Sequence, residues 1–346
     1  MGRQGRSPVM KDVARLAGVS HITVSRVVNQ APNVHPVTRE RVIAAMIELG
    51  YRPNLAARAL VTRRSHTLGV IAVKGTLFGP ASTLLSIEQA ARARGYYLSI
   101  VSVDDVTPGV LQEALERLAK QGVEGLVVMA PRRHAIESLA QMPPGLPVVT
   151  VEGGGAPGTG AVLVDQAGGA AAATRHLVEL GHRRVVHLAG PSDWLEAEAR
   201  QEGWRATCRE AGLPTPRPLR GDWSPRSGYR AARRLLGRLE KVTAVFAAND
   251  QMALGALRAF AEAGVRVPED VSVVGFDDIP EAEFLHPPLT TVRQDFAAVG
   301  QCCVALLTHA VEQADGHAET VVVPAQLLVR SSTAPPRPAG VPGWRG

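Results

Sequence analysis

From Thr67 onward the sequence alternates short, continuous apolar runs with longer amphipathic stretches, and this alternation constrains the fold more than any other feature. A first cycle contains the runs T-L-G-V-I-A-V, Y-L-S-I-V-S-V, G-L-V-V-M-A and P-V-V-T-V, and a second contains R-V-V-H-L-A-G, A-V-F-A-A and V-S-V-V-G-F. Strands that are apolar at most positions are typical of parallel sheets that helical crossovers cover on both faces. The two cycles therefore predict two doubly wound α/β lobes.

Helices are expected between these strands, at residues 82–94, 109–121, 169–180, 196–211, 228–239 and 250–263. Ligands of such sheets bind at the carboxyl ends of the strands. Polar side chains stand at two of these ends, because Asn249 and Asp250 follow A-V-F-A-A, and Asp277 and Asp278 follow V-S-V-V-G-F. Their amide and carboxylate groups can bind the hydroxyls of a ligand, or they can cap the next helix.

The first sixty residues follow a helical period instead. A first helix ends at Gly18, a residue suited to the left-handed conformation that follows a helix, and Ser20 then caps a second helix. A third helix begins near Thr38 and ends at Gly50. The residues expected to face inward are Met10, Val13, Leu16, Ala17, Val24, Val27, Val28, Val42, Ala45, Met46 and Leu49. Two helices joined by a short turn around Gly18 predict a helix-turn-helix unit.

Charge is distributed unevenly between these two parts. Residues 1–64 carry 11 Lys and Arg against 3 Asp and Glu, whereas the remainder carries 27 basic and 29 acidic residues. A positive excess confined to one small unit favours a polyanionic partner such as DNA. The alternative, a solvated and disordered basic tail, is disfavoured by the regular apolar period of the same segment.

The outward face at the start of the second helix carries groups that suit DNA. It comprises Ser20, His21, Ile22, Thr23, Ser25 and Arg26. Hydroxyls and a helix N-terminus can hold phosphates, and an arginine can form two hydrogen bonds to the O6 and N7 atoms of guanine.

Several stretches resemble the lac repressor (LacI/GalR) family of transcription regulators. The headpiece of that family is matched by D-V-A-R-L-A-G-V-S-x-x-T-V-S-R-V-V-N, by T-R-E-R-V-x-A-A-M-x-E-L-G-Y-R-P-N and by A-A-R-A-L. Its larger body is matched by H-L-V-E-L-G-H-R-R-V, A-N-D-Q-M-A-L-G-A, V-S-V-V-G-F-D-D and P-P-L-T-T-V-R-Q-D-F. The resemblance extends from residue 11 to about residue 332. It implies an all-α helix-turn-helix headpiece followed by a bilobed α/β domain like the periplasmic sugar-binding proteins, with two doubly wound parallel sheets.

The resemblance also implies a division of the chain. Residues 1–52 would form the DNA-binding headpiece, 53–65 a hinge helix and linker, and 66–332 an effector-binding and dimerisation domain. Lobe one would comprise about 66–163 and 294–323, and lobe two about 164–293 and 324–332. The Pro- and Gly-rich residues 333–346 are expected to be a disordered tail.

Particular residues acquire roles from the same resemblance. His21 and Ile22 occupy the positions that select the operator sequence, and Arg26 that of a base-reading arginine. Further DNA-contacting positions are Asn29, Asn54, Ala57 and Leu60, and in the family the hinge leucine that Leu60 matches enters the minor groove, where an apolar wedge bends the duplex. The effector-contacting positions are Leu77, Pro80, Glu152, Arg200, Trp223, Asn249, Asp277 and Gln294.

The same resemblance, which is close in the segment G-D-W-S-x-x-S-G-Y around Trp223, implies a galactoside or a related β-linked glycoside as effector. A tryptophan can stack on the apolar face of a pyranose ring, and the guanidinium of Arg200 supplies a planar set of donors. Asp165, after the run A-V-L-V, is expected to cap a helix. The function that follows is an allosteric, sugar-binding repressor of carbohydrate-utilisation genes that its effector releases from the operator. Use of the ligand as co-repressor is the alternative.

Other classes of function find little support. Gly153, Gly155 and Gly158 match G-x-G-x-x-G, but Pro157 and a second strand follow where a dinucleotide site needs a helix. No nucleophile–base pair, cofactor motif or metal-ligand cluster is visible, so neither an enzyme nor a cofactor or metal protein is expected, and no apolar run is long enough for a membrane span. A transport-type sugar-binding protein would have a signal peptide and no headpiece. We expect a cytoplasmic, nucleoid-associated homodimer that binds a pseudo-palindromic double-stranded operator.

Overall fold

The structure is a computed structural model that describes residues 8–28, 31, 33–51, 64–75, 77–129, 132–139, 145–154, 158–238, 242–313 and 319–337. It divides into two compact units, Met1–Ser65 and His66–Gly346, each of which is described by itself. Among the helices of the described residues, none is long and apolar enough to cross a membrane.

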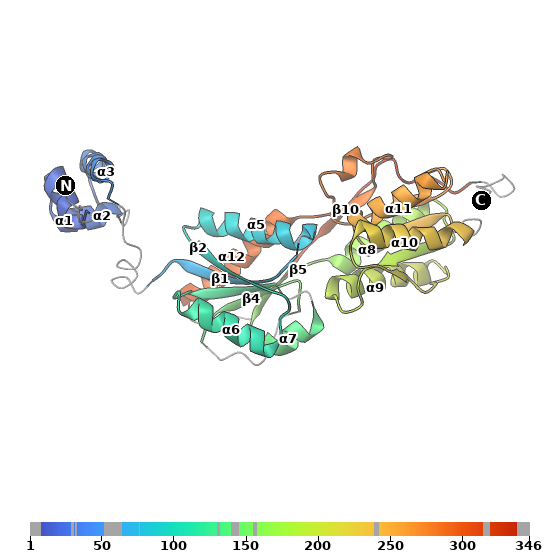
Figure 1. Cartoon of the computed structure of the whole chain (residues 1–346), viewed down its shortest axis with the longest axis horizontal. Coiled ribbons are helices and arrows are strands. Elements are labelled where there is room, and N and C mark those ends of the chain that lie inside the picture. The colour runs from blue at the N-terminus through green and yellow to red at the C-terminus, as the bar shows by residue number, and fades with distance from the viewer. Residues whose placement is uncertain are drawn as a thin grey trace, which may run out of the picture. The chain divides into compact units, whose positions relative to one another are not determined.

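The described residues of the N-terminal unit form three helices, α1 (Met10–Ala17), α2 (His21–Val28) and α3 (Pro36–Leu49) (Figure 1). Gly18 ends α1 with a φ of 62°, a left-handed conformation that lets the chain turn into α2. Ser20 caps α2 by accepting a hydrogen bond on its Oγ from the backbone N–H of Thr23 at 3.1 Å. The helix-turn-helix predicted from the sequence is therefore present.

Two details of this unit differ from the prediction. The third helix begins at Pro36, two residues before Thr38, because proline at the first helical position needs no hydrogen-bond donor and has a suitable φ. Leu16, expected to face inward, is 45% exposed, while its neighbour Ala14 is buried in the core.

Lobe one of the second unit is built on a six-stranded parallel sheet. Its strands are β1 (Thr67–Val73), β2 (Tyr97–Val103), β3 (Gly125–Met129), β4 (Val148–Val151), β5 (Gly160–Val164) and β11 (Thr320–Val323), in the order β11-β5-β4-β3-β1-β2. Helices α5 (Phe78–Ala93) and α12 (Phe296–Gln313) cover one face, and α6 (Pro108–Ala119) and α7 (Arg133–Leu139) cover the other (Figure 1).

Lobe two contains a four-stranded parallel sheet in the order β7-β6-β8-β9. These strands are β6 (Val185–Ala189), β7 (Leu219–Arg220), β8 (Ala244–Ala247) and β9 (Ser272–Val274). Helices α8 (Gln166–Glu179) and α9 (Leu195–Glu210) pack on one face, and α10 (Pro225–Leu235) and α11 (Asp250–Glu262) on the other. Two short 3₁₀ helices, Leu236–Arg238 and Ala282–Phe284, complete this lobe.

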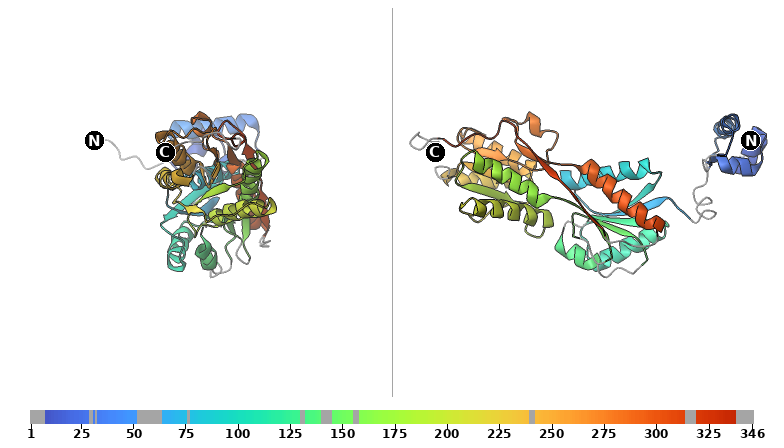
Figure 2. Two further views of the ribbon diagram at one scale, coloured as in Figure 1. Left: turned by 90° about the vertical axis from the view of Figure 1, so that its right-hand side faces the viewer. Right: turned by 180° about the vertical axis from the view of Figure 1, so that it is seen from behind.

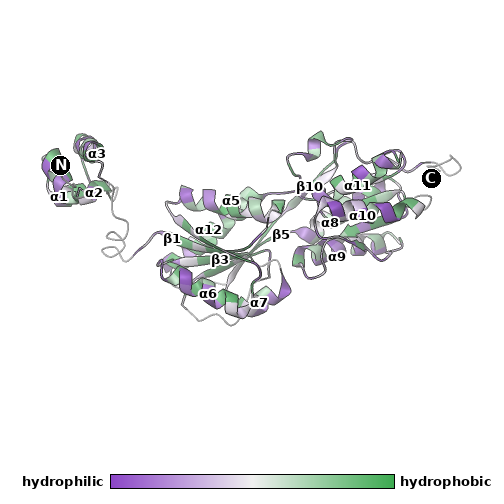
Figure 3. Ribbon diagram, in the orientation of Figure 1, coloured by the Kyte–Doolittle hydropathy of each residue, from purple (hydrophilic) through white to green (hydrophobic). Residues whose placement is uncertain are grey.

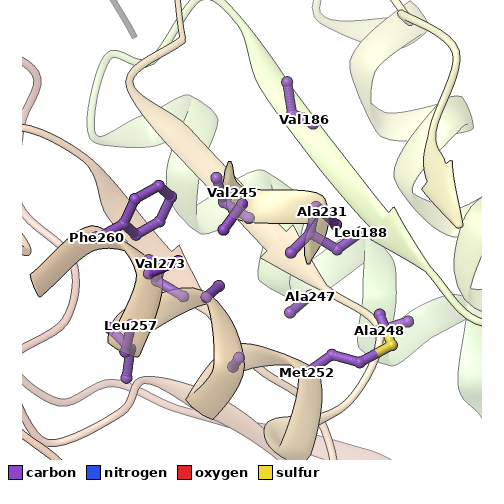
Figure 4. Close-up of a cluster of buried hydrophobic side chains, with 14 of the residues drawn as sticks. Val186, Leu188, Ala231, Val245, Ala247, Ala248, Met252, Leu257, Phe260 and Val273 are labelled. Atoms are coloured by element: carbon purple, nitrogen blue, oxygen red, sulfur yellow. The ribbon is translucent and has the colours of Figure 1, made fainter. Parts of the chain in front are cut away.

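Apolar side chains fill both sides of each sheet, so each lobe is a three-layer α/β structure. Figure 4 shows one side of the lobe-two core, where Val245 and Val273 of the sheet lie near Leu257 and Phe260 of α11. Figure 3 shows the same pattern at the level of the chain, with apolar strands between helices that carry polar outer faces. The two doubly wound parallel sheets predicted from the sequence are confirmed.

Three connections link the lobes. Strand β5 of lobe one leads through Asp165 into α8 of lobe two, and β11 leads through Pro324 into β12 (Ala325–Leu328). The third connection is β10 (Thr291–Gln294), which pairs antiparallel with β12 and leads into α12 (Figure 2). Any rotation of one lobe against the other must therefore bend the chain at these three places.

Several element boundaries lie outside the prediction. Helix α5 begins at Phe78 rather than at residue 82, because Pro80 falls in the first turn, where proline is tolerated. The short elements α7 and β7 were not predicted, and neither were β10, α12, β11 and β12.

The expected disorder of residues 333–346 is wrong for its first part. The side chain of Thr333 is 2.9 Å from His176 Nε2, and the backbone N–H of Ala334 donates to Ser272 Oγ at 3.0 Å. These hydrogen bonds hold residues 333–334 against lobe two, and described structure continues to Arg337.

Candidate functional site

The outward face of α2 is assembled as the sequence predicts. His21, Ile22 and Arg26 are exposed, while Val24 and Val27 on the opposite side of the helix are buried in the three-helix core. Ile22 is 53% exposed, so this branched apolar side chain is available to a thymine methyl group.

The hydroxyl groups at the start of α2 are partly committed to the helix itself. Ser20 Oγ lies 2.9 Å from Thr23 Oγ1, in addition to its capping bond from the Thr23 amide. Ser25 is half-buried on the same helix. The remaining positions expected to contact DNA, which are Asn29, Asn54, Ala57 and Leu60, lie outside the described residues.

The second unit contains a cleft between its lobes. Seven of the eight positions expected to contact an effector line one cavity of about 310 Å³, part of it open to solvent. Lobe one contributes Leu77 and Pro80 from the start of α5, and the connecting strand β10 contributes Gln294. Lobe two contributes the others, Arg200, Trp223, Asn249 and Asp277.

Four buried polar side chains form a closed ring of hydrogen bonds beside this cavity. Arg200 Nε donates to Gln166 Oε1 at 2.8 Å, and Gln166 Nε2 donates to Gln294 Oε1 at 2.9 Å. Gln294 Nε2 in turn donates to Asp277 Oδ1 at 2.7 Å, and this oxygen is 3.3 Å from Arg200 Nη1. Each member orients the next, so the ring presents fixed donors and acceptors before a ligand arrives.

Arg200 is held by further contacts. Its Nη1 donates to the carbonyl oxygen of Ala248 at 2.5 Å, and its guanidinium carbon lies 3.9 Å from the centre of the Phe276 ring and 5.5 Å from that of Trp223. Stacking on aromatic faces stabilises a desolvated guanidinium. The charge of this side chain therefore stays in the cleft at a fixed position.

Trp223 forms an aromatic wall of the cavity. Its ring packs against the backbone of Gly190, where any Cβ atom would come within 2.4 Å of the indole, and it lies edge-on to Trp194 at 5.7 Å. The indole Nε1 is buried and has no acceptor within the described part of the chain. A ligand oxygen at this point would satisfy a donor that is costly to leave unpaired.

Asp277 carries a perturbed carboxyl group. Burial raises its pKa from 3.8 to about 6, although Arg200 beside it and the hydrogen bond from Gln294 act in the opposite direction. The desolvation of the carboxylate therefore outweighs its ion pair. A buried carboxyl group with a perturbed pKa in a cleft is typical of a functional site.

Backbone strain is concentrated in the same region. Trp223, Asp277 and Asp278 have φ angles of 70°, 112° and 54°, and Glu152 on lobe one has a φ of 67°. Residues with a side chain rarely adopt such angles unless the surrounding structure imposes them, and they occur preferentially at ligand sites.

Other polar side chains at the strand ends have structural roles. Asn249 Oδ1 caps α11 by accepting from the Met252 amide at 3.0 Å, and its amide group donates to the Trp223 carbonyl at 3.1 Å, so it both caps the helix and positions the tryptophan. Asp250 is fully buried and bonded to Ile279 and Thr291. Asp278 forms ion pairs with Arg293 and Arg330, both at 2.7 Å. Asp165 caps α8 by accepting a hydrogen bond from the Gly168 amide, which is the role expected from the sequence.

Glu152 is the one predicted effector position that the structure places elsewhere, in a neighbouring cavity. It follows β4, which β3 separates from β1 in the sheet. Conversely, Gln166, Trp194 and Glu196 were not predicted. Gln166 follows β5 after Asp165, and the rule that ligands bind at strand ends could have identified it; Trp194 and Glu196 lie at the start of α9, the helix after β6.

Comparison with known proteins gives a match for each of the two units of the chain. The family model of bacterial regulatory proteins of the lacI family matches residues 9–54, and that of a periplasmic binding protein-like domain matches residues 174–333. The chain is 38% identical over 340 residues to the HTH-type transcriptional regulator CelR of Thermobifida fusca, which covers 94% of this chain and 98% of that protein.

Solved structures extend the likeness to three dimensions. The structure of the lac repressor dimer bound to operator and the anti-inducer ONPF matches with a TM-score of 0.83 at 35% identity, covering 95% of this chain and 100% of the other. A complex of the transcriptional regulator CelR with cellobiose matches with a TM-score of 0.69 at 35% identity, over 94% and 99% of the two chains.

The helix-turn-helix unit and the bilobed body together define a DNA-binding transcriptional regulator with a ligand-sensing domain, and not an enzyme. The chain belongs to the LacI family of bacterial regulatory proteins.

Proposed function

We propose that the protein is a homodimeric repressor of carbohydrate-utilisation genes that binds a pseudo-palindromic operator and is released from it by a sugar. The observation that carries the proposal is the ring of Arg200, Gln166, Gln294 and Asp277 beside Trp223. Planar donors, buried acceptors and an aromatic face in one cleft are the groups that recognise the hydroxyls and the apolar face of a pyranose.

The favoured effector is a galactoside or a related β-linked glycoside. The tryptophan segment G-D-W-S-x-x-S-G-Y supports this class, and a relative of similar length, CelR, has been solved as a complex with cellobiose. The ring already satisfies most of its own hydrogen bonds, so a ligand gains affinity from the groups that remain unpaired, above all the indole Nε1 of Trp223.

DNA recognition belongs to the N-terminal unit. Two headpieces in a dimer read two half-sites, in which His21 and Ile22 select the sequence, Arg26 contacts a base and the segment that contains Leu60 contacts the minor groove. Hydroxyl groups at the start of α2 and the surplus of positive charge in residues 1–64 support the phosphate contacts.

The link between the two sites is the arrangement of the lobes. Gln294 and Gln166 lie on interlobe connections, while Arg200 and Asp277 belong to lobe two. A sugar that binds one arrangement of the lobes more tightly shifts the population towards it, and operator affinity falls if that arrangement separates the two headpieces of the dimer.

A pair of variants separates the two activities. Arg26→Ala removes a base contact and should weaken binding to operator DNA about tenfold or more, with the affinity for sugar unchanged. Trp223→Ala should weaken sugar binding about tenfold, with operator binding unchanged in the absence of sugar. The measurements are fluorescence anisotropy with labelled DNA from upstream of the protein's own gene, and calorimetry with lactose, cellobiose and their methyl β-glycoside counterparts.

The two outcomes serve as controls for each other, because a misfolded variant would lose both activities. The proposal fails if the wild-type chain binds no operator sequence more tightly than random DNA. It also fails in its sensing part if no glycoside changes the anisotropy titration.

A further inference from the structure

The two lobes also touch at a place that is not one of the three chain crossings. Arg132, between β3 and α7 of lobe one, forms an isolated antiparallel bridge through its backbone with Trp194, which precedes α9 of lobe two. Pairing of this kind brings two backbones to about 5 Å from each other. The bridge is therefore a non-covalent joint between the lobes.

Ion pairs strengthen this joint. Arg132 Nε lies 3.4 Å from Asp193 Oδ2, and Arg133 Nη2 lies 2.5 Å from Glu198 Oε2, so two cations of lobe one meet two anions of lobe two. The guanidinium of Arg132 also lies over the ring of Trp194, 5.9 Å from its centre, where a cation is attracted by the aromatic face. These five residues are called the latch below.

Lobe one holds Arg132 in place from behind. Its Nη1 donates to Asp105 Oδ2 at 3.2 Å, while Asp105 Oδ1 lies 2.9 Å from His134 Nε2 and accepts from the Val106 amide at 2.9 Å. Burial acts to raise the pKa of Asp105, but these hydrogen bonds and the charge of Arg132 outweigh it and hold the pKa below its usual value. The carboxylate therefore stays charged and anchors Arg132 beside lobe two.

The latch reaches the candidate effector site through Trp194. This side chain is buried, lines the first cavity and lies edge-on to Trp223 at 5.7 Å. The four charged members of the latch line neither that cavity nor its neighbour. They act on a ligand in the first cavity through Trp194 and through the arrangement of the lobes, and not by direct contact.

We propose that Arg132 and Arg133 are positioning residues of the effector site, whose latch stabilises the lobe arrangement described above and places Trp194 against Trp223 before a ligand arrives. In this arrangement the hydrogen-bonded ring beside the first cavity is closed, so this is the arrangement that binds sugar. The effect on sugar and operator rests on the proposed function, in which the two prefer different arrangements, whereas the latch itself can be measured without either.

The pair of Arg133 and Glu198 offers the sharpest test. Their side chains are 65% and 41% exposed, so each position tolerates the opposite charge. One exposed ion pair shifts an equilibrium by up to about fivefold, and reversal of one charge replaces the attraction with a repulsion. Arg133→Glu and Glu198→Arg should each shift the lobe population about fivefold away from the latched arrangement, and the double variant should restore it.

Sugar affinity and operator affinity should then move in opposite directions. If sugar binds only the latched arrangement and operator only the other, the fall in sugar affinity multiplied by the rise in operator affinity equals the shift in lobe population. This product should be about fivefold in each single variant and about one in the double variant. The single variants change the net charge in opposite directions, so an effect that they share does not arise from net charge.

The lobe arrangement is measured on the full chain without ligand, by electron resonance distances between spin labels at Glu113→Cys of α6 and Arg230→Cys of α10. Both positions are exposed and belong to different lobes. Cys302→Ser removes the partly exposed native thiol, and refolding with an excess of unlabelled chain makes distances within one chain dominate. The distance that matches the latched arrangement should lose population in each single variant and regain it in the double variant.

Affinities are measured by calorimetry with lactose and cellobiose, and by anisotropy with labelled DNA from upstream of the protein's own gene. Arg117→Glu on α6 and Glu210→Arg on α9 are the matched controls. They reverse exposed charges on the same two lobes, and neither residue has an ion pair across the lobes in the described part of the chain. Both controls should behave like wild type.

The latch is refuted if the single variants keep the wild-type lobe population, or if the double variant fails to restore it, as a folding defect would. If both affinities fall in the single variants and both return in the double variant, the latch is confirmed and release of the operator by sugar is wrong. If neither sugar binds the wild-type chain, the sensing part of the proposed function fails, and the resonance distances alone decide the latch.

Discussion

Asp277→Asn should make the protein more stable at neutral pH while it impairs ligand binding. Asparagine has nearly the same shape as aspartate, and its oxygen can still accept the 2.7 Å hydrogen bond from Gln294. The substitution removes a carboxylate whose burial raises its pKa from 3.8 to about 6, which means that the folded protein holds the charged form at a cost in free energy.

The magnitude follows from proton linkage. A pKa that is higher by about two units in the folded state corresponds to about 3 kcal/mol, since each unit is worth about 1.4 kcal/mol. Below pH 3.8 the wild-type side chain is neutral in both states, so the full contribution to stability is present, and it is lost as the pH rises through about 6. The advantage of Asp277→Asn over wild type should therefore grow with pH, by about 1.4 kcal/mol between about pH 5 and about pH 8.

The assay is urea denaturation of both proteins across that pH range, followed by tryptophan fluorescence, with Glu281→Gln as an exposed control that should show no such trend. Sugar affinity should fall about tenfold in Asp277→Asn because a charged acceptor becomes neutral. The reasoning is refuted if the difference in stability between variant and wild type does not change with pH, or if the variant is the less stable protein at pH 8. Either result would mean that Arg200 compensates the buried charge in full.

Three further predictions concern the two units separately. Gly255→Ala should destabilise lobe two by about 3 kcal/mol or more in thermal unfolding, because the new Cβ would lie 1.8 Å from the Pro225 carbonyl oxygen between α11 and α10. The control Gly237→Ala should unfold like wild type, because its new Cβ would have no atom within 4 Å. Ser20→Ala should destabilise the headpiece by about 1 kcal/mol, because the Thr23 amide loses its cap. Hydrogen exchange of the α2 amides should become faster, and an unchanged exchange rate would contradict the prediction. Operator affinity should fall steeply, about tenfold or more, when salt rises from about 50 to about 200 mM, and a flat salt dependence would exclude extensive phosphate contacts.

Most of the fold could be predicted because its pattern is local. The apolar runs from Thr67 onward mark β1, β2, β3, β4, β6 and β8 within a residue or two, since buried parallel strands are apolar at most positions. Local patterns are weaker at the ends of elements. Helix α5 starts at Phe78 although Pro80 suggests a later beginning, and Leu16 is exposed although its spacing places it on the apolar face of α1.

The candidate site was predictable in part, for a physical reason. Asn249 and Asp277 could be found because they directly follow strands, and the strand-end rule is local. The hydrogen bonds that join the ring could not be predicted, because Gln166 bonds to Gln294 over 128 positions of the chain and to Arg200 over 34. Such pairings depend on how the lobes pack, and no spacing in the sequence encodes them.

The composition of the ring explains how a small ligand could control a distant headpiece in the mechanism we propose. Gln166 directly follows the crossing from β5, and Gln294 ends the crossing strand β10, whereas Arg200 and Asp277 are anchored in lobe two. A rotation of the lobes bends the chain at these crossings and so changes the distances within the ring, which makes its hydrogen bonds to a ligand sensitive to lobe arrangement. Converting a 1:99 population into 99:1 takes about 5.5 kcal/mol of differential binding, which two to four hydrogen bonds to charged groups supply at about 1.5 to 3 kcal/mol each. In the mechanism we propose, the effector must therefore make contacts of this total strength in one arrangement of the lobes that it loses in the other.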